Sequence, residues 1–132
     1  MTKDFQLAGQ SIMAFVATTN PEGAKKFYRD TLKLPLMSEE LPFALVFDLG
    51  GTMLRVTIVE KFNPAPFTVL GWKVPDIVVA MKALQKAGVT FQRFPGMDQD
   101  GLGIWKSPSG AKIAWFKDPE GNTLSLSQHA NE

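Results

Sequence analysis

The sequence predicts an α+β (mixed α/β) fold with antiparallel sheets, built from two tandem β-α-β-β-β modules. One observation is a repeated phrase, because residues 48–56 (DLGGTMLRV) align without a gap with residues 118–126 (DPEGNTLSL). The other is that each copy of the phrase follows the same order of strand and helix patterns. A chain of 132 residues with 45% hydrophobic residues has the length and composition of one globular domain. We therefore expect a duplicated module within a single domain, residues 1–132.

The second copy of the phrase lies in a predicted strand, turn and strand over residues 115–127. Asp118-Pro119 opens the turn because proline presets its backbone angle, and Gly121-Asn122 closes it because both residues tolerate positive φ. Polar residues and leucines then alternate strictly from residue 123 to 127, which is the pattern of a strand with one buried face.

Module one is expected to span residues 11–60. Asn20 is a favourable N-cap and Pro21 suits the first position of a helix, after which apolar residues recur at helical spacing as far as Leu32. The predicted elements are a strand at 11–18, a helix at 21–32, and strands at 36–40, 43–49 and 53–58.

A linker at residues 61–66, which contains two prolines, precedes module two at residues 67–128. The predicted elements of module two are strands at 67–74, 89–94, 111–117 and 123–128, with a helix at 76–87. About fifteen extra residues in this module fall in the 95–110 loop, which contains four glycines and Trp105.

Composition excludes several function classes. Fourteen Lys and Arg against thirteen Asp and Glu give a net charge of +1, so we expect neither nucleic acid nor an anionic membrane as a partner. The absence of cysteine excludes disulfides, thiolate metal sites and a cysteine nucleophile. No apolar run approaches the length of a membrane span, and the first ten residues lack the apolar region of a signal peptide. We therefore expect a soluble, cytoplasmic protein.

Two modules of this order, with the motifs they carry, resemble the vicinal oxygen chelate superfamily, the group of glyoxalases, bleomycin-resistance proteins and extradiol dioxygenases. The closing phrase at residues 116–126 (FKDPEGNTLSL) is similar to the DPxGN pattern of that group, and Lys26-Phe27-Tyr28 with Leu32 adds support in the first helix. The resemblance covers nearly all of residues 11–128. It implies that each module curls its sheet into a half-barrel and that a ligand lies in the shared concave face.

Metal-dependent members of the resembled superfamily hold a divalent ion with His, Gln or Glu at four strand positions. Those positions fall here on Met13, Arg55, Val69 and Ser125, none of which is a suitable metal ligand. The only histidine, His129, is expected to be exposed near the C-terminus. We therefore expect no bound metal and no other cofactor.

Strand parity selects the side chains that the resemblance would place in the concave face. The polar candidates for ligand binding are Arg55, Thr57, Lys73, Thr123, Ser125 and Ser127, and the apolar ones are Met13, Phe15, Val69 and Trp115. Trp105 is the expected contact of a lid formed by the 95–110 loop. The polar side chains are also compatible with an ordinary solvated sheet face.

Arg55 is the candidate on which recognition depends most. No carboxylate is predicted on its face of the matching strand, and a buried guanidinium without a partner is costly. We therefore expect a carboxylate, phosphate or enolate oxygen of the ligand to bind Arg55.

These patterns predict a protein that binds a polar or anionic small molecule without a metal, similar to the drug-sequestering branch of the superfamily. The alternative is a glyoxalase-related lyase or isomerase, or a dioxygenase-type metalloenzyme with non-standard ligands. No catalytic residue is evident, since no interior histidine or central carboxylate is available to accept a proton. A pure interaction module would have no ligand-sized cavity. By analogy with relatives of this size, and because half-barrels expose strand edges, we expect a homodimer.

Overall fold

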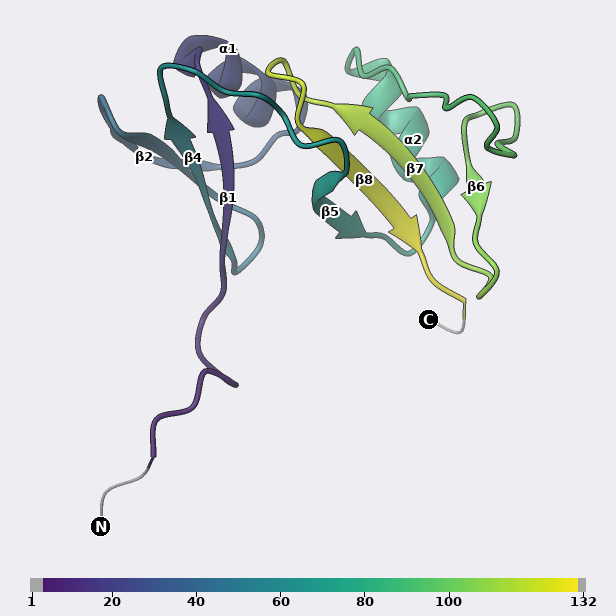
Figure 1. The fold of residues 1–132 in the computed structure, drawn as a ribbon, viewed down its shortest axis with the longest axis horizontal. Coiled ribbons are helices and arrows are strands. Elements are labelled where there is room, and N and C mark those ends of the chain that lie inside the picture. The colour runs from purple at the N-terminus through teal and green to yellow at the C-terminus, as the bar shows by residue number, and fades with distance from the viewer. Residues whose placement is uncertain (1–3, 131–132) are drawn as a thin grey trace.

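The computed structural model describes residues 4–130, which form two four-stranded sheets joined by a linker (Figure 1). Module one contains β1 (Met13–Thr18), α1 (Pro21–Lys25), η1 (Lys26–Thr31), β2 (Leu36–Glu40), β3 (Ala44–Asp48) and β4 (Met53–Ile58). Module two contains β5 (Thr68–Lys73), α2 (Ile77–Lys86), β6 (Trp105–Lys106), β7 (Lys112–Lys117) and β8 (Thr123–Gln128). None of the helices in residues 4–130 has the length and hydrophobicity needed to cross a membrane.

Both sheets have the same topology, β1-β4-β3-β2 in module one and β5-β8-β7-β6 in module two. This confirms the two β-α-β-β-β modules predicted from the repeated phrase. The expectation of antiparallel sheets is wrong, because the first strand of each module pairs in parallel with the last, β1 with β4 and β5 with β8. The remaining strand pairs are antiparallel.

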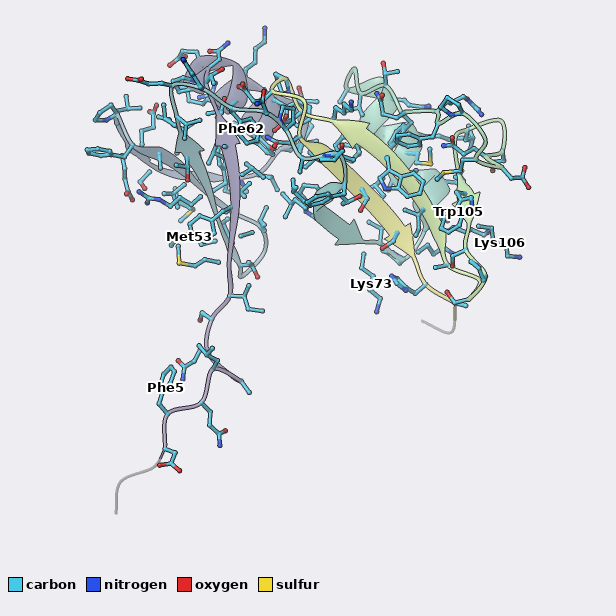
Figure 2. All side chains as sticks on the ribbon, in the orientation of Figure 1. Phe5, Met53, Phe62, Lys73, Trp105 and Lys106 are labelled. Atoms are coloured by element: carbon cyan, nitrogen blue, oxygen red, sulfur yellow. The ribbon has the colours of Figure 1, made fainter. Side chains whose placement is uncertain are left out.

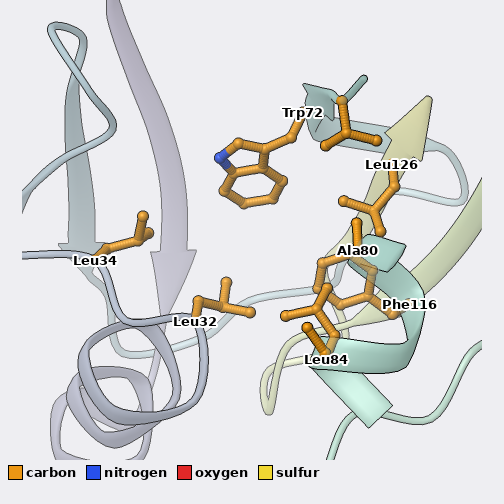
Figure 3. A pocket seen from close by; sticks show the side chains of 9 residues that line it. Leu32, Leu34, Trp72, Ala80, Leu84, Phe116 and Leu126 are labelled. Atoms are coloured by element: carbon orange, nitrogen blue, oxygen red, sulfur yellow. The ribbon is translucent and has the colours of Figure 1, made fainter. Parts of the chain in front are cut away.

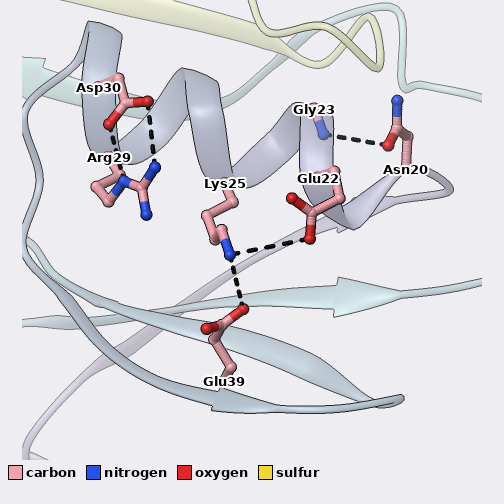
Figure 4. A network of polar contacts seen from close by, with 7 residues as sticks. All are labelled: Asn20, Glu22, Gly23, Lys25, Arg29, Asp30 and Glu39. Carbon is pink, nitrogen blue, oxygen red and sulfur yellow. Dashed lines mark hydrogen bonds and ion pairs between the residues drawn. The ribbon is translucent and has the colours of Figure 1, made fainter.

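The helical segments begin where the capping residues predict. Asn20 Oδ1 accepts a hydrogen bond from the Gly23 N–H at 3.1 Å, and Asp76 Oδ1 accepts bonds from Val78 and Val79 at 3.1 and 3.2 Å. The first predicted helix is divided into a five-residue α-helix and the π-helix η1. Lys25 of α1 reaches Glu39 of β2 at 3.1 Å, an ion pair that lies on the surface of module one (Figure 4).

The predicted strand at residues 89–94 is wrong. Only Phe91 forms an isolated bridge, with Phe116, and β6 supplies the missing strand of module two. Side-chain hydrogen bonds of Gln99 account for much of this difference. Its amide group donates to Gln92 O at 3.0 Å and accepts from Phe94 N at 2.8 Å, so these backbone groups are satisfied without a strand partner.

The core lies on one face of each sheet and joins the two modules. The helical residues Ala24, Tyr28, Ile77 and Met81 belong to the same buried cluster as the inward-facing residues of β4 and β8. The helices therefore cover the core face of the sheets. We call the opposite face, which no helix of residues 4–130 covers, the concave face.

A buried hydrogen-bond network fastens the β7-β8 turn to module one. Asp118 is 7% exposed, and its Oδ2 accepts hydrogen bonds from Tyr28 Oη at 2.6 Å and from Asn122 Nδ2 at 2.8 Å. Its Oδ1 accepts the backbone N–H groups of Glu120 and Asn122 at 3.0 and 2.9 Å. Asn122 Nδ2 also donates to Ala17 O at 3.0 Å. Burial and the neighbouring charge of Asp118 raise the pKa of Tyr28 well above its usual range, so its hydroxyl stays a donor.

Glu120 extends this network across the module boundary. Its carboxylate accepts bonds from Thr18 Oγ1 at 2.9 Å, Thr19 N at 2.7 Å and Thr19 Oγ1 at 2.7 Å. Partial desolvation opposes ionisation, but the hydrogen bonds from Thr19 and Thr18 outweigh it and lower the pKa of Glu120. We name Tyr28, Asp118, Glu120 and Asn122 the inter-module clamp. The DPEGN phrase thus holds the two modules together.

Candidate functional site

Strand register places the predicted site residues on the concave face. In module one, Phe15 lies beside Arg55, and Thr57 lies one pair further along the same face. In module two, Ser125 lies between Gly71 and Trp115, while Ser127 pairs with Lys73 and Thr123 with Thr68. In Figure 2, Met53 lies in module one and Lys73 at the lower end of module two, so the two side chains come from different sheets. Met13, which pairs with Met53, lies at the same end of module one.

Two of the expected metal-ligand positions are shifted by the observed register. Arg55 and Ser125 have Phe15 and Gly71 as their first-strand neighbours, and not Met13 and Val69. The β5-β8 ladder is irregular between Thr68 and Leu70, so Val69 stands outside it. A Cβ at Gly71 would lie 2.5 Å from Ser125 Oγ, so a ligating residue there would require Ser125 to shift.

The donor set of the concave face does not fit a divalent metal. Phenylalanine and glycine offer no side-chain donor, and a guanidinium repels a cation. Within residues 4–130, no group of three or more His, Cys, Asp and Glu side chains could hold a metal ion. His129 is exposed and contacts Ser127 Oγ at 3.2 Å.

A cavity of about 320 Å³ opens where the two modules meet. Three of the predicted site residues line it, Phe15 from β1, Thr57 from β4 and Val69 from β5. Phe62 and Asn63 of the linker and Asn122 of the inter-module clamp complete much of the wall. Within residues 4–130, no charged side chain lines this cavity. The clamp therefore borders the cavity directly, and sequence parity did not reveal the contribution of the linker.

The expected unpartnered guanidinium of Arg55 is contradicted by the structure. Arg55 Nη1 lies 2.8 Å from Glu40 Oε1. Glu40 shares the concave face, because it pairs with Ala44, which pairs in turn with Thr57. The long side chain of Arg55 thus spans β3 to reach β2. The need for a ligand anion falls away, and the concave face contains a carboxylate that sequence reasoning missed.

Known structures share this arrangement of sheets and helices. A glyoxalase family protein from Bacillus anthracis superposes with a TM-score of 0.71 at 19% identity, covering 98% of this chain and 99% of the other. The lactoylglutathione lyase from Agrobacterium tumefaciens gives 0.69 at 13%, covering 91% and 93%. TnmS3, an antibiotic binding protein from Streptomyces sp. CB03234, gives 0.68 at 21%, covering 96% and 100%. No family model and no curated protein sequence matches the chain.

The chain has the vicinal oxygen chelate fold. The superpositions extend over nearly the whole chain, so both modules and their connection share the fold. This confirms the architecture that the resemblance implied. At 13 to 21% identity the likeness is one of fold.

Within the vicinal oxygen chelate fold of this chain, module two contains a cluster of aromatic side chains. The ring of Trp115 lies 6.1 Å from that of Trp105 and 5.5 Å from that of Phe94, and its Nε1 donates to Thr68 Oγ1 at 3.0 Å. Trp105 belongs to β6 and pairs with Ile113, so it is part of the sheet. Trp105 thus belongs to a strand and not to a loop, and through Ile113 its register places it on the same face as Ser127. That the 95–110 loop closes over this face stays a prediction.

The loop between residues 95 and 104 is ordered by its own hydrogen bonds. The carboxylate Oδ1 of Asp100 accepts the N–H groups of Leu102, Gly103 and Ile104 at 2.9, 3.1 and 2.9 Å. These bonds, that of Ile104 foremost, lower the pKa of Asp100. Asp100 therefore fixes the approach to β6.

Proposed function

We propose that the concave face binds a small polar molecule with a flat apolar part, without a metal ion, and sequesters it. The observation that carries this proposal is the 320 Å³ cavity between the modules, which has the size of a small-molecule site. Phe15 is 56% exposed although it stands in mid-strand, and Val69 is also exposed. Apolar surface exposed in a concavity favours binding of an apolar group. The antibiotic-binding role of TnmS3 supports a sequestering function.

The polar part of the ligand is proposed to contact Thr57 in the cavity and to extend along the same face to the Arg55–Glu40 pair, which lies outside the cavity. Thr57 lines the cavity and lies two residues beyond Arg55 on β4. Because the pair carries both signs, a neutral polar group gains hydrogen bonds without disturbing it, whereas an anion competes with Glu40 for Arg55. We therefore favour a neutral polar ligand over an anionic one.

The proposed setting is the cytoplasm, with the chain acting as a homodimer. β2 is an edge strand of its sheet, and the nearby Met37, Leu41 and Phe43 are exposed apolar side chains. A second copy that covered this edge would pair the free backbone groups of β2 and bury these apolar side chains.

Phe15→Ala should weaken binding of 2-naphthamide, a neutral bicyclic probe, by about tenfold, because the substitution removes aromatic contact area. Isothermal titration calorimetry would measure this affinity. The matched control is Phe43→Ala, since Phe43 is 67% exposed in the same module and does not line the cavity. Equal losses in the two variants, or no binding by the unaltered protein, would contradict the concave site. The anionic 2-naphthoate should bind more weakly than the amide, and the reverse order would assign an anion to Arg55.

One observation favours a second candidate function, a metal-independent lyase or isomerase. The carboxylate of Glu40 lies on the concave face and can accept a proton, while Arg55, 2.8 Å away, can stabilise the enolate oxygen that forms. If this candidate is correct, the protein should catalyse exchange of the proton beside the carbonyl of hydroxyacetone with solvent deuterium. NMR measures the rate of this exchange. Glu40→Gln should abolish the exchange. If the unaltered protein exchanges this proton no faster than buffer alone, the lyase or isomerase candidate is contradicted. Binding then remains the proposed function.

A further inference from the structure

A second cavity lies on the helix side of the sheets, away from the concave face. It has a volume of about 260 Å³ and shares no lining residue with the concave cavity. We name it the inter-module crevice, because Leu32 and Leu34 of module one form one wall, and α2 and β5 of module two form the other (Figure 3). All nine of its lining residues are apolar or aromatic.

The floor of the inter-module crevice belongs to the rigid core. Phe116 and Leu126 are both buried, and Figure 3 shows them beside Ala80 and Leu84 of α2. The ring of Trp72 stacks near Phe116, with centroids 6.3 Å apart and planes 23° from parallel. The side chains of this crevice are therefore held in place by packing, while the space above the floor is open.

One polar group lines this apolar space. Trp72 Nε1–H is the only side-chain hydrogen-bond donor among the lining residues, and it makes no hydrogen bond within residues 4–130. Figure 3 shows the indole nitrogen turned toward the wall formed by module one. Within residues 4–130 no buried side-chain nitrogen or oxygen lacks a hydrogen-bond partner, so this N–H is not buried and is open to solvent. A bound molecule with an acceptor at that position would accept a hydrogen bond from it in place of water.

We propose that the inter-module crevice is a second binding site, for a small, flat, apolar molecule that carries one hydrogen-bond acceptor. A dry cavity of about 150 Å³ holds benzene, so about 260 Å³ suits two fused six-membered rings. A protein partner is disfavoured, because stable protein interfaces bury hundreds of square ångströms on each side and have a polar rim. The inter-module crevice, with about 260 Å³ and nine lining residues, is much smaller than such an interface. This site is independent of the proposed function of the concave face.

Quinoline and naphthalene form a matched pair of probes, since they share shape and differ by one acceptor nitrogen. Quinoline should bind about fivefold tighter than naphthalene, which is the effect of one neutral hydrogen bond. NMR titration of the indole N–H resonances measures both affinities. The resonance of Trp72, identified as the one missing in Trp72→Phe, should shift most with quinoline. Trp72→Phe should bind the two probes equally.

A filling variant tests the location independently. Ala83 is an exposed helical residue that lines the inter-module crevice, so Ala83→Phe should block binding while the helix persists. Val79→Phe is the matched control, because Val79 is 64% exposed on the same helix and does not line the crevice. Circular dichroism verifies that both variants fold. The proposal is overturned if quinoline still binds Ala83→Phe, if both probes bind the unaltered protein equally or not at all, or if Phe15→Ala abolishes quinoline binding.

Discussion

Replacing Asp118 with alanine should lower the free energy of unfolding by about 3 to 5 kcal/mol. The carboxylate accepts four hydrogen bonds, from Tyr28 Oη, Asn122 Nδ2 and two backbone N–H groups. Alanine would leave these donors without an acceptor in a site that is 7% exposed. Unpaired buried polar groups cost more than the net gain of the bonds they lose. Urea unfolding followed by tryptophan fluorescence measures the change.

The duplicated sequence supplies a matched control for this experiment. Asp48 occupies the same position in module one, where, among the described residues, its carboxylate accepts only the N–H groups of Gly50 and Gly51, at 3.0 and 2.9 Å. Asp48→Ala should therefore cost about 1 kcal/mol, as expected for a turn near the surface. Similar losses for the two alanine variants would show that Asp118 serves only its own turn and does not fasten the modules.

Tyr28→Phe should lower the free energy of unfolding by about 1.5 to 3 kcal/mol, the range for a hydrogen bond to a charged group. Tyr28 is fully buried, and its hydroxyl donates to Asp118 at 2.6 Å. The ring contacts with Phe27 and Phe47 would remain, so the loss isolates the hydroxyl. The same unfolding measurement checks this value.

A double-mutant cycle assigns the Tyr28 effect to the inter-module clamp. In the Asp118→Ala background, the tyrosine hydroxyl has already lost its acceptor, so adding Tyr28→Phe should cost little or restore stability. If the two substitutions add fully, the hydroxyl acts through another partner and the clamp does not include Tyr28.

The resemblance to the superfamily and the alternation of polar and apolar residues along the strands together predicted much of the concave site. The DPEGN phrase indicated a tight turn, and the alternation after it placed Ser125 and Leu124 on opposite faces, as observed. The N-caps Asn20 and Asp76 marked the helix starts. Such features depend on residues near one another in the chain, so a single sequence expresses them.

No sequence pattern indicated the inter-module crevice. Leu32 and Leu34 follow η1, whereas Trp72 lies on β5 and Phe116 on β7. Each of these residues has the pattern of an ordinary core position. Only the packing of one module beside the other leaves space between them.

By itself, the sequence determined the duplication, the fold and the face on which most concave-site side chains lie. Tertiary structure alone decided that Glu40 meets Arg55, that Val69 leaves the ladder and that Trp105 joins a strand. Local patterns fix φ, ψ and the direction of a side chain, because these depend on near neighbours. Register, bulges and ion pairs depend on which distant strand lies alongside, and that choice is made by the packing of the whole chain.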